Sequence, residues 1–173
     1  MIVWLVGLSG AGKTTIARAL HARWQAIDPA TVLIDGYEIR DIFKHDQGTA
    51  PFTVAGRRVN GERIAAMSAW LDNQNINAVV SILCIFPDIM AENKNRFSDY
   101  FEVFVDAPLA ALEARDGKGL YAAARSGEMA NVVGMDIPFP TPEQPDMVVR
   151  NDGTVLDANA VAADILGRIG VAP

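Results

Sequence analysis

The chain has 173 residues, of which 50% are hydrophobic; this composition excludes a disordered chain and predicts a single globular domain over residues 1–173. Its formal net charge of −6 at pH 7 disfavours non-specific binding to nucleic acid or to an anionic membrane, so we expect neither as a partner. Cys84 is the single cysteine, which excludes an intramolecular disulfide and favours a cytoplasmic location, and no apolar stretch approaches the roughly 18 residues of a membrane span.

An apolar run at residues 2–6 predicts the first strand, and the glycine-rich stretch after it predicts a phosphate-binding loop. Residues 7–14, GLSGAGKT, fill every position of the motif G-x-x-x-x-G-K-[ST], and a helical pattern over residues 14–25 follows. In this setting, backbone N–H groups and the helix N-terminus surround phosphate oxygens. Lys13 is expected to reach the outer phosphates and Thr14 to ligate Mg²⁺. The alternative, a glycine-rich turn with a chance lysine, is disfavoured by the complete motif and its flanks. The residues expected to bind a nucleoside triphosphate are Gly7, Ser9, Gly10, Ala11, Gly12, Lys13, Thr14 and Thr15.

The second predicted strand, residues 31–34, is followed directly by Asp35. At the carboxyl end of a strand this carboxylate would lie near the triphosphate, where it could orient an attacking hydroxyl, accept its proton or hold Mg²⁺ through water. An aspartate is also a good N-cap for the helix predicted at residues 37–44. Position alone leaves both interpretations open.

A longer helix, predicted at residues 54–73, has polar groups at the start of its buried face. Its apolar stripe, which includes Ile64 and Met67, extends backwards by steps of three and four to Asn60 and Arg57. Inward-facing polar groups need partners, because an unpaired buried charge is costly. A phosphate or sugar ligand would satisfy both side chains, and an internal salt bridge is the alternative.

The rest of the chain alternates apolar runs with helical patterns. Strands are predicted at residues 78–83, 101–105 and 147–150, and helices at 87–95, 109–114 and 156–169. Near-continuous apolar strands separated by helices are typical of a parallel sheet covered on both faces. The predicted fold is therefore α/β: a P-loop NTPase-type three-layer sandwich with a mostly parallel five-stranded sheet, whose ligands bind beyond the carboxyl ends of the strands.

Residues 115–119, RDGKG, combine two glycines with basic side chains and begin a segment with a further arginine, Arg125. Such a segment can close over phosphates and exclude water, so we expect a lid at about residues 115–135. An ordinary solvated loop would have a similar composition.

Two classes of phosphate-loop protein compete, a nucleotide switch or motor and a small-molecule kinase. A switch GTPase would carry the signature N-K-x-D, but the nearest string, residues 93–96, ends in arginine. The L-S-G-G-Q signature of a transporter-type ATPase is missing from the sequence. The compact size and the basic lid favour a kinase.

Taken together, these motifs resemble the adenylylsulfate (APS) kinases, which transfer the γ-phosphoryl group of ATP to the 3′-hydroxyl of APS. The resemblance runs from residue 2 to about residue 148, and the strongest matches lie between residues 101 and 138. The family patterns concerned include L-D-G-D-N-x-R, F-x-x-x-x-R-x-x-N and G-x-D-x-P-Y. The matching segments are residues 7–15, 33–40, 52–60, 102–109, 113–121 and 134–139.

The resemblance implies ATP and Mg²⁺ as cofactors, a small-molecule nucleotide as substrate, and a homodimer. It makes Asp35 the catalytic aspartate beside Lys13, and it places Arg115 against the ATP adenine. The residues that it assigns to the acceptor substrate are Asp35, Arg40, Phe52, Arg57, Asn60, Lys118 and Phe139, with the two phenylalanines stacking on the acceptor base.

Three departures from the family pattern concern the acceptor side. Tyr37 replaces the second aspartate of D-G-D, and residues 84–88, CIFPD, replace I-S-P-[FY]-R, so the expected serine and arginine are absent. The spacing between Arg40 and Phe52 is about three residues longer than usual. Losing one charge-assisted hydrogen bond costs roughly 1.5–3 kcal/mol, about one to two decades in affinity, which is enough to change a preferred substrate.

We therefore expect an ATP-dependent kinase that phosphorylates the ribose 3′-hydroxyl of a nucleotide with a second group on its 5′ phosphate, with APS as the first candidate. A 3′-kinase for another activated nucleotide, such as cytidine diphosphoramidate in capsule biosynthesis, is the alternative. A nucleotide-binding regulator without catalysis is a third reading, which the intact Lys13, Thr14 and Asp35 disfavour.

Overall fold

The computed structural model describes residues 1–44, 52–153 and 156–171. The strands are β1 (Ile2–Val6), β2 (Thr31–Asp35), β3 (Asn77–Ile82), β4 (Tyr100–Asp106) and β5 (Met147–Arg150). The helices are α1 (Lys13–Ile27), α2 (Gly36–Ile42), α3 (Val54–Asp72), α4 (Pro87–Arg96), α5 (Leu109–Ala114), α6 (Leu120–Arg125) and α7 (Ala158–Arg168).

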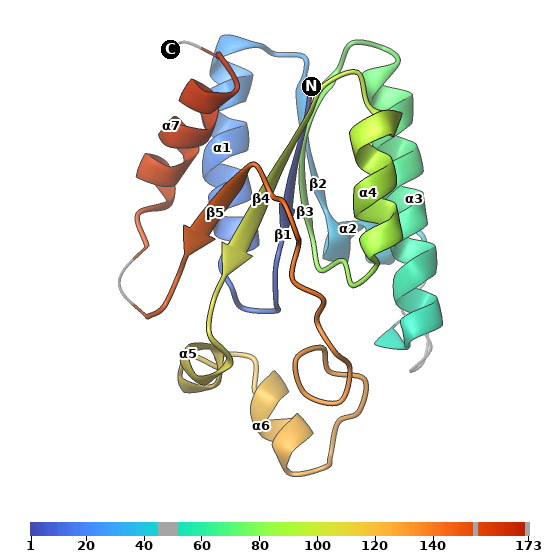
Figure 1. Ribbon diagram of the computed structural model, residues 1–173, viewed down its shortest axis with the longest axis vertical. Helices are drawn as coiled ribbons and strands as arrows, with labels where there is room; N and C mark the ends of the chain where they lie inside the picture. Colours follow the sequence, from blue (N-terminus) through green and yellow to red (C-terminus); the bar gives the residue numbers. More distant parts are fainter. Residues whose placement is uncertain (45–51, 154–155, 172–173) are drawn as a thin grey trace.

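The five strands form one sheet in the order β2-β3-β1-β4-β5, and every neighbouring pair is parallel. Helices α1 and α7 cover one face of this sheet, and α3 and α4 cover the other (Figure 1). Figure 1 also shows α5 and α6 beyond the carboxyl end of β4, and α6 lies in the segment predicted to be a lid. The predicted α/β three-layer sandwich is confirmed, and the described part of its sheet is entirely parallel.

The protein has two hydrophobic cores, one on each face of the sheet, and the side chains of β1 contribute alternately to both. All five residues of this central strand are 0% exposed, because helices pack on both of its faces. Trp4 belongs to the cluster on the side of α3 and α4, whereas Leu5 packs with Leu20 and Ile165 on the side of α1 and α7. Successive side chains of a strand point to opposite faces, so one apolar run serves both layers.

Helix α6 was not predicted from the sequence. Asp116 stabilises its first turn, because its carboxylate accepts hydrogen bonds from the backbone N–H groups of Leu120, Tyr121 and Ala122 at 2.8–2.9 Å. Gly119 precedes the helix with φ +65°, a left-handed conformation that favours glycine. A short helix in a segment rich in glycine and charge gives too little periodicity to be recognised.

Smaller differences concern the ends of elements. The helix predicted at residues 37–44 ends at Ile42, and the strand predicted at 78–83 ends at Ile82. The longer spacing between Arg40 and Phe52 falls largely on residues 45–51, which lie outside the described residues. Within the ranges that the structure describes, no helix combines the length and the apolar character that a transmembrane segment requires.

Strand order also decides where the site lies. The chain leaves β1 towards α1, and β1 lies between β3 and β4, where the strand order reverses. In an open parallel sheet, ligands bind at such a point, beyond the carboxyl ends of the strands. The loop after β1, the end of β2 and the end of β3 therefore meet at one edge.

Candidate active site

The phosphate-binding loop joins β1 to α1 at this edge. A Cβ atom on Gly7 would lie 2.4 Å from the carbonyl oxygen of Val105, so only glycine fits there. Gly12 caps α1 with φ 102°, in the left-handed region. The Lys13 ammonium donates a hydrogen bond of 2.7 Å to the carbonyl oxygen of Leu8, at the start of the same loop. The loop thus has the geometry of an anion-binding site that ends in a helix N-terminus.

Asp35 combines the two interpretations that the sequence left open, a helix N-cap and a carboxylate beside the phosphate-binding loop. One carboxylate oxygen, Oδ1, accepts from the backbone N–H of Tyr37 at 2.9 Å and so caps α2. The other, Oδ2, accepts from the Thr14 hydroxyl at 2.8 Å, which directs it towards the phosphate loop. The capping role and the location beside the loop are therefore both confirmed for this one side chain.

Ser81 is a polar group at this edge that the sequence reasoning missed. It lies on β3 opposite Asp35, and its Oγ is 3.3 Å from the Thr14 hydroxyl. The one feature of the sequence that indicates a polar group here is the single serine inside the otherwise apolar run of residues 78–83. Thr14, Asp35 and Ser81 together give a cluster of oxygen atoms, which is the kind of ligand that Mg²⁺ prefers.

Arg57 and Asn60 lie at the start of α3 and face the same edge. The Arg57 guanidinium donates to the carbonyl oxygens of Phe52 and Asn131, both at 2.8 Å, so its protein partners are neutral carbonyls rather than the salt bridge that was the alternative. Burial lowers the pKa of Arg57, and the charge of Arg40 adds to this effect. Asn60 donates to the carbonyl oxygen of Gly36 at 3.3 Å, while its buried Oδ1 has no partner among the described residues.

Lys118, in the segment predicted to be a lid, lies over the ring of Tyr37, with Nζ 4.5 Å from the ring centroid. The same segment is tied to the phosphate loop by two side chains. Tyr121 donates a buried hydrogen bond of 2.7 Å to the carbonyl oxygen of Ser9. Arg115 donates to the Asn151 side-chain oxygen at 2.7 Å, and the Asn151 amide in turn donates to the carbonyl oxygen of Ala11 at 2.9 Å.

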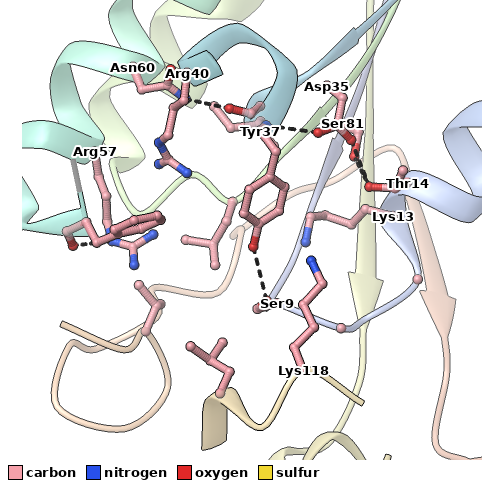
Figure 2. Close-up of a pocket in the computed structure, with 18 of the residues that line it drawn as sticks. Ser9, Lys13, Thr14, Asp35, Tyr37, Arg40, Arg57, Asn60, Ser81 and Lys118 are labelled. Carbon is pink, nitrogen blue, oxygen red and sulfur yellow. Dashed lines mark hydrogen bonds between the residues drawn. The ribbon is translucent and has the colours of Figure 1, made fainter. Parts of the chain in front are cut away.

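These groups surround a cavity of about 300 Å³. Figure 2 shows Arg40 and Arg57 on one side of Tyr37, and Lys13 and Lys118 on the other. The predicted site residues that line the cavity are Ser9, Gly10, Gly12, Lys13, Thr14, Thr15, Asp35, Arg40, Phe52, Arg57, Asn60 and Lys118. Lining residues that the sequence did not assign to the site are Gly36, Tyr37, Ser81, Ile82, Leu83, Leu120, Val132 and Val133.

Four predicted site residues do not line this cavity: Gly7, Ala11, Arg115 and Phe139. Gly7 and Ala11 belong to the loop backbone, and Arg115 lies against Asn151 on the far side of the loop. Phe139 stacks on Phe104 with ring centroids 6.0 Å apart and lines a second cavity of about 550 Å³, so its expected place at the acceptor base stays a prediction. Phe52 and Phe139 thus line different cavities, since apolar packing at the end of β4 holds the Phe139 ring there.

The replaced acceptor loop, residues 84–88, holds its one carboxylate, Asp88, at the surface. Asp88 forms a bidentate ion pair with Arg58 at 2.8 and 3.1 Å on the surface, away from the cavity. Phe86 is buried beneath the guanidinium of Arg58, 4.2 Å from its ring centroid. Burial raises the pKa of the Cys84 thiol to about 11, so that thiol stays protonated. The loop therefore brings no carboxylate into the cavity, whose wall nearby is formed by Ile82 and Leu83.

The cavity is electropositive although the chain is acidic. Among the described residues that line it, four cationic side chains, Lys13, Arg40, Arg57 and Lys118, face one carboxylate, Asp35, in a chain of net charge −6. Burial lowers the pKa of Lys13 to about 8; the charge of Asp35 opposes this shift and that of Lys118 adds to it. A site with this balance is built for a ligand with several negative charges.

A phosphate loop at the reversal point of a parallel sheet, beside a carboxylate and an electropositive cavity, defines a P-loop phosphotransferase. The sequence profile of the adenylylsulphate kinase family matches residues 1–150. The chain belongs to this family, and it is an ATP-dependent phosphotransferase.

Individual relatives agree with this assignment. The chain is 40% identical over 155 residues to a probable adenylyl-sulfate kinase of Synechocystis sp., covering 90% of this chain and 86% of the relative. It is 34% identical over 150 residues to the cytidine diphosphoramidate kinase of Campylobacter jejuni, covering 87% and 85%. The structure of the Mycobacterium tuberculosis APS kinase CysC in complex with AMPPNP and APS superimposes with a TM-score of 0.83 at 29% identity, covering 98% of this chain and 96% of the other.

Proposed function

We propose that residues 1–173 form one kinase domain that transfers the γ-phosphoryl group of ATP to the 3′-hydroxyl of APS. The observation that carries the proposal is the location of Asp35, whose Oδ2 accepts from Thr14 of the phosphate loop at 2.8 Å and which lines the same cavity as Arg40 and Arg57. A carboxylate between a phosphate-binding loop and an arginine pair suits the transfer of a phosphoryl group from one anionic nucleotide to another. The similarity to adenylyl-sulfate kinases over most of the chain supports APS as the acceptor.

On the donor side, the backbone N–H groups of residues 10–13 would bind the β-phosphate, and Lys13 would neutralise charge on the γ-phosphate. The oxygen atoms of Thr14, Asp35 and Ser81 fit a magnesium ion, because they gather at one edge beside Lys13. A magnesium ion held by these side chains would supply positive charge that offsets the negative charge developing during transfer. Arg115 is linked to the phosphate-binding loop by Asn151, with which it forms a hydrogen bond. Its contact with the adenine of ATP stays a prediction.

On the acceptor side, Asp35 would accept a hydrogen bond from the 3′-hydroxyl and take its proton as the oxygen bonds to the γ-phosphorus and ADP leaves. Arg40, Arg57 and Lys118 would bind the acceptor anions. The Oδ1 of Asn60, which has no partner within the described part of the chain, would accept a hydrogen bond from a sugar hydroxyl. Phe52 lines the cavity for the acceptor base, whereas a role of Phe139 at that base stays a prediction.

A second acceptor, cytidine diphosphoramidate, is favoured by one observation. The cavity wall next to the acceptor side has the neutral Tyr37 and the apolar Ile82 and Leu83. The Campylobacter jejuni relative named for this substrate covers 87% of the chain, as noted above. The terminal group of the amidate has the same single negative charge as the terminal sulfate of APS, but its NH₂ group also donates hydrogen bonds, which a neutral hydroxyl such as that of Tyr37 can accept.

The test is to measure ADP formation with Mg-ATP against APS, cytidine diphosphoramidate, plain nucleotides and small polyols. We expect kcat/KM to be highest for APS, with the 3′-phosphorylated nucleotide as product. A higher kcat/KM for cytidine diphosphoramidate would identify it, instead of APS, as the acceptor. ATP binding without turnover of any acceptor would overturn the proposal that the protein is a kinase. Light scattering would test the predicted homodimer, and cell fractionation would test the predicted cytoplasmic location.

A further inference from the structure

One wall of the cavity alternates cationic side chains with aromatic rings. Lys118 Nζ lies 4.5 Å from the centroid of the Tyr37 ring, and Arg40 Cζ lies 6.0 Å from the same centroid. Arg40 Cζ is also 5.2 Å from the Phe52 centroid, and Arg57 Cζ is 5.8 Å from it. We name this row of five side chains, Lys118, Tyr37, Arg40, Phe52 and Arg57, the cation–ring wall.

Tyr37 is the member of this wall that connects the separate parts of the site. Its backbone N–H donates to Asp35, its hydroxyl lies 3.4 Å from the Ser9 Oγ of the phosphate loop, and its ring meets Lys118 of the predicted lid. Figure 2 shows the ring between Arg40 on one side and the two lysines on the other. One side chain therefore touches the donor loop, the lid and the acceptor side.

We propose that Tyr37 is a positioning residue, whose ring holds the Lys118 ammonium at the cavity and so prepares it to bind the anionic nucleotides. The proposal deepens the proposed function and rests on it for its kinetic test only. A ring attracts a cation through its quadrupole and does not neutralise it, so Lys118 keeps its full charge for a phosphate or sulfate. A carboxylate at position 37 would also attract Lys118 but would compete with the ligand for it.

The charge of Lys118 acts on the donor side as well. Its ammonium lines the same cavity as that of Lys13, and Figure 2 shows both on the same side of Tyr37. Like charges repel, so an attractive contact to Lys118 favours its position at the cavity before the anions arrive. The Tyr37 ring supplies that contact, at 4.5 Å from the ammonium.

The kinetic test compares Tyr37→Phe, which keeps the ring, with Tyr37→Leu, which removes it. A contact of this kind is expected to change affinity about fivefold, because it orders Lys118 before binding and is not specific to the transition state. We therefore expect Tyr37→Leu to raise the acceptor KM about fivefold with kcat little changed, and Tyr37→Phe to stay within about twofold of the wild type. In a Lys118→Met background the difference between the two variants should vanish.

A second measurement needs no turnover. In protein labelled with ¹³C-lysine, the Lys118 side-chain protons nearest the ammonium should be shifted upfield by the ring, and the signal is assigned by its loss in Lys118→Arg. The shift should persist in Tyr37→Phe and disappear in Tyr37→Leu. An unshifted Lys118 signal in the wild type, or an equal KM effect of Tyr37→Leu with and without Lys118, would overturn the inference. If the proposed function were wrong, turnover would be absent but the upfield shift of the Lys118 signal would remain. The two failures can therefore be told apart.

Discussion

The Thr14 hydroxyl donates a hydrogen bond of 2.8 Å to Asp35, across the carboxyl ends of the sheet. β1, which leads into the loop of Thr14, and β2, which ends at Asp35, are not neighbours; β3 lies between them and contributes Ser81 to the same cluster. A hydroxyl has one proton and two lone pairs, so Thr14 can keep donating to Asp35 while it offers a lone pair to a metal ion. This bond therefore joins the predicted metal ligand and the predicted catalytic carboxylate.

Replacing the carboxylate by an amide separates its two roles. In Asp35→Asn the one remaining side-chain oxygen can still cap α2, and the NH₂ group that replaces Oδ2 can donate to the Thr14 hydroxyl once that hydroxyl turns its proton away, so thermal stability should change little. The amide cannot take up the acceptor proton, and we expect kcat to fall by about 10²–10⁴. Steady-state kinetics and thermal denaturation check both statements. Asp35→Ala is the control, because it also loses the cap and should cost about 1 kcal/mol of stability; an active Asp35→Asn would contradict the catalytic role.

Lys13→Met should lower the activity of the protein and raise its stability. The buried ammonium has a pKa of about 8, well below its ordinary value of 10.5, so folding the charged form is costly at pH 7. Methionine keeps much of the apolar stem and removes the charge, and the free energy of unfolding without ligand should rise by about 1–3 kcal/mol. Turnover should fall by at least about 100-fold, because a donor to the transferred phosphate is lost. Urea denaturation and an ADP-release assay measure the two effects, and a variant that is both active and less stable would refute this account.

The same lysine predicts how pH acts on the protein. Between its folded pKa of about 8 and its unfolded pKa of 10.5, the unfolded chain binds the proton and the folded chain does not, so this group makes the folded state more stable as pH rises. ATP binding has the opposite dependence, because phosphate requires the charged ammonium. We expect the Kd for ATP to rise by about tenfold per pH unit above pH 8, as measured by calorimetry. In Lys13→Met this dependence should be absent, and a wild-type Kd that stays flat to pH 9.5 would show that another group binds the phosphate.

Arg57 and its neighbour Arg58 offer a matched pair of variants. Arg57 lines the cavity and its protein partners are carbonyl oxygens, whereas Arg58 pairs with Asp88 on the surface. Arg57→Ala should raise the acceptor KM about 10- to 100-fold with the ATP KM unchanged, since one charge-assisted contact is lost. Arg58→Ala should leave both constants within about twofold. A raised ATP KM in Arg57→Ala, with the acceptor KM unaffected, would assign this arginine to the donor instead.

Tyr121 ties the predicted lid to the phosphate loop through its bond to Ser9. Burial raises the pKa of its hydroxyl to about 12, so it remains a donor throughout the physiological range. Tyr121→Phe leaves the ring in place, removes this one bond and should lower the free energy of unfolding by about 0.5–1.5 kcal/mol. Thermal denaturation measures the loss. Ser126→Ala is a suitable control, because the hydroxyl of Ser126 donates only to the exposed end of α6 and its removal should be nearly neutral.

Much of the fold and of the donor side could be predicted from the sequence. The phosphate loop is a local motif, in which the glycines permit the backbone path and the lysine and threonine follow at fixed spacing. The five strands were recognised from continuous apolar runs, because the physical requirement of two covered faces leaves a direct pattern. Asp35 could be placed near the loop because it directly follows a predicted strand, and its two hydrogen bonds agree with both of the roles considered.

The acceptor side depended on contacts between distant segments. Only the tertiary structure places Ser81 opposite Asp35, Tyr37 between Arg40 and Lys118, and Phe139 on Phe104 instead of beside Phe52. The sequence by itself determined that the chain binds phosphate, because that ability lies in consecutive residues and in backbone conformation. The folded chain decided which side chains meet at the cavity, because packing across strands and between helices selects among rotamers and partners that neighbouring residues leave undetermined.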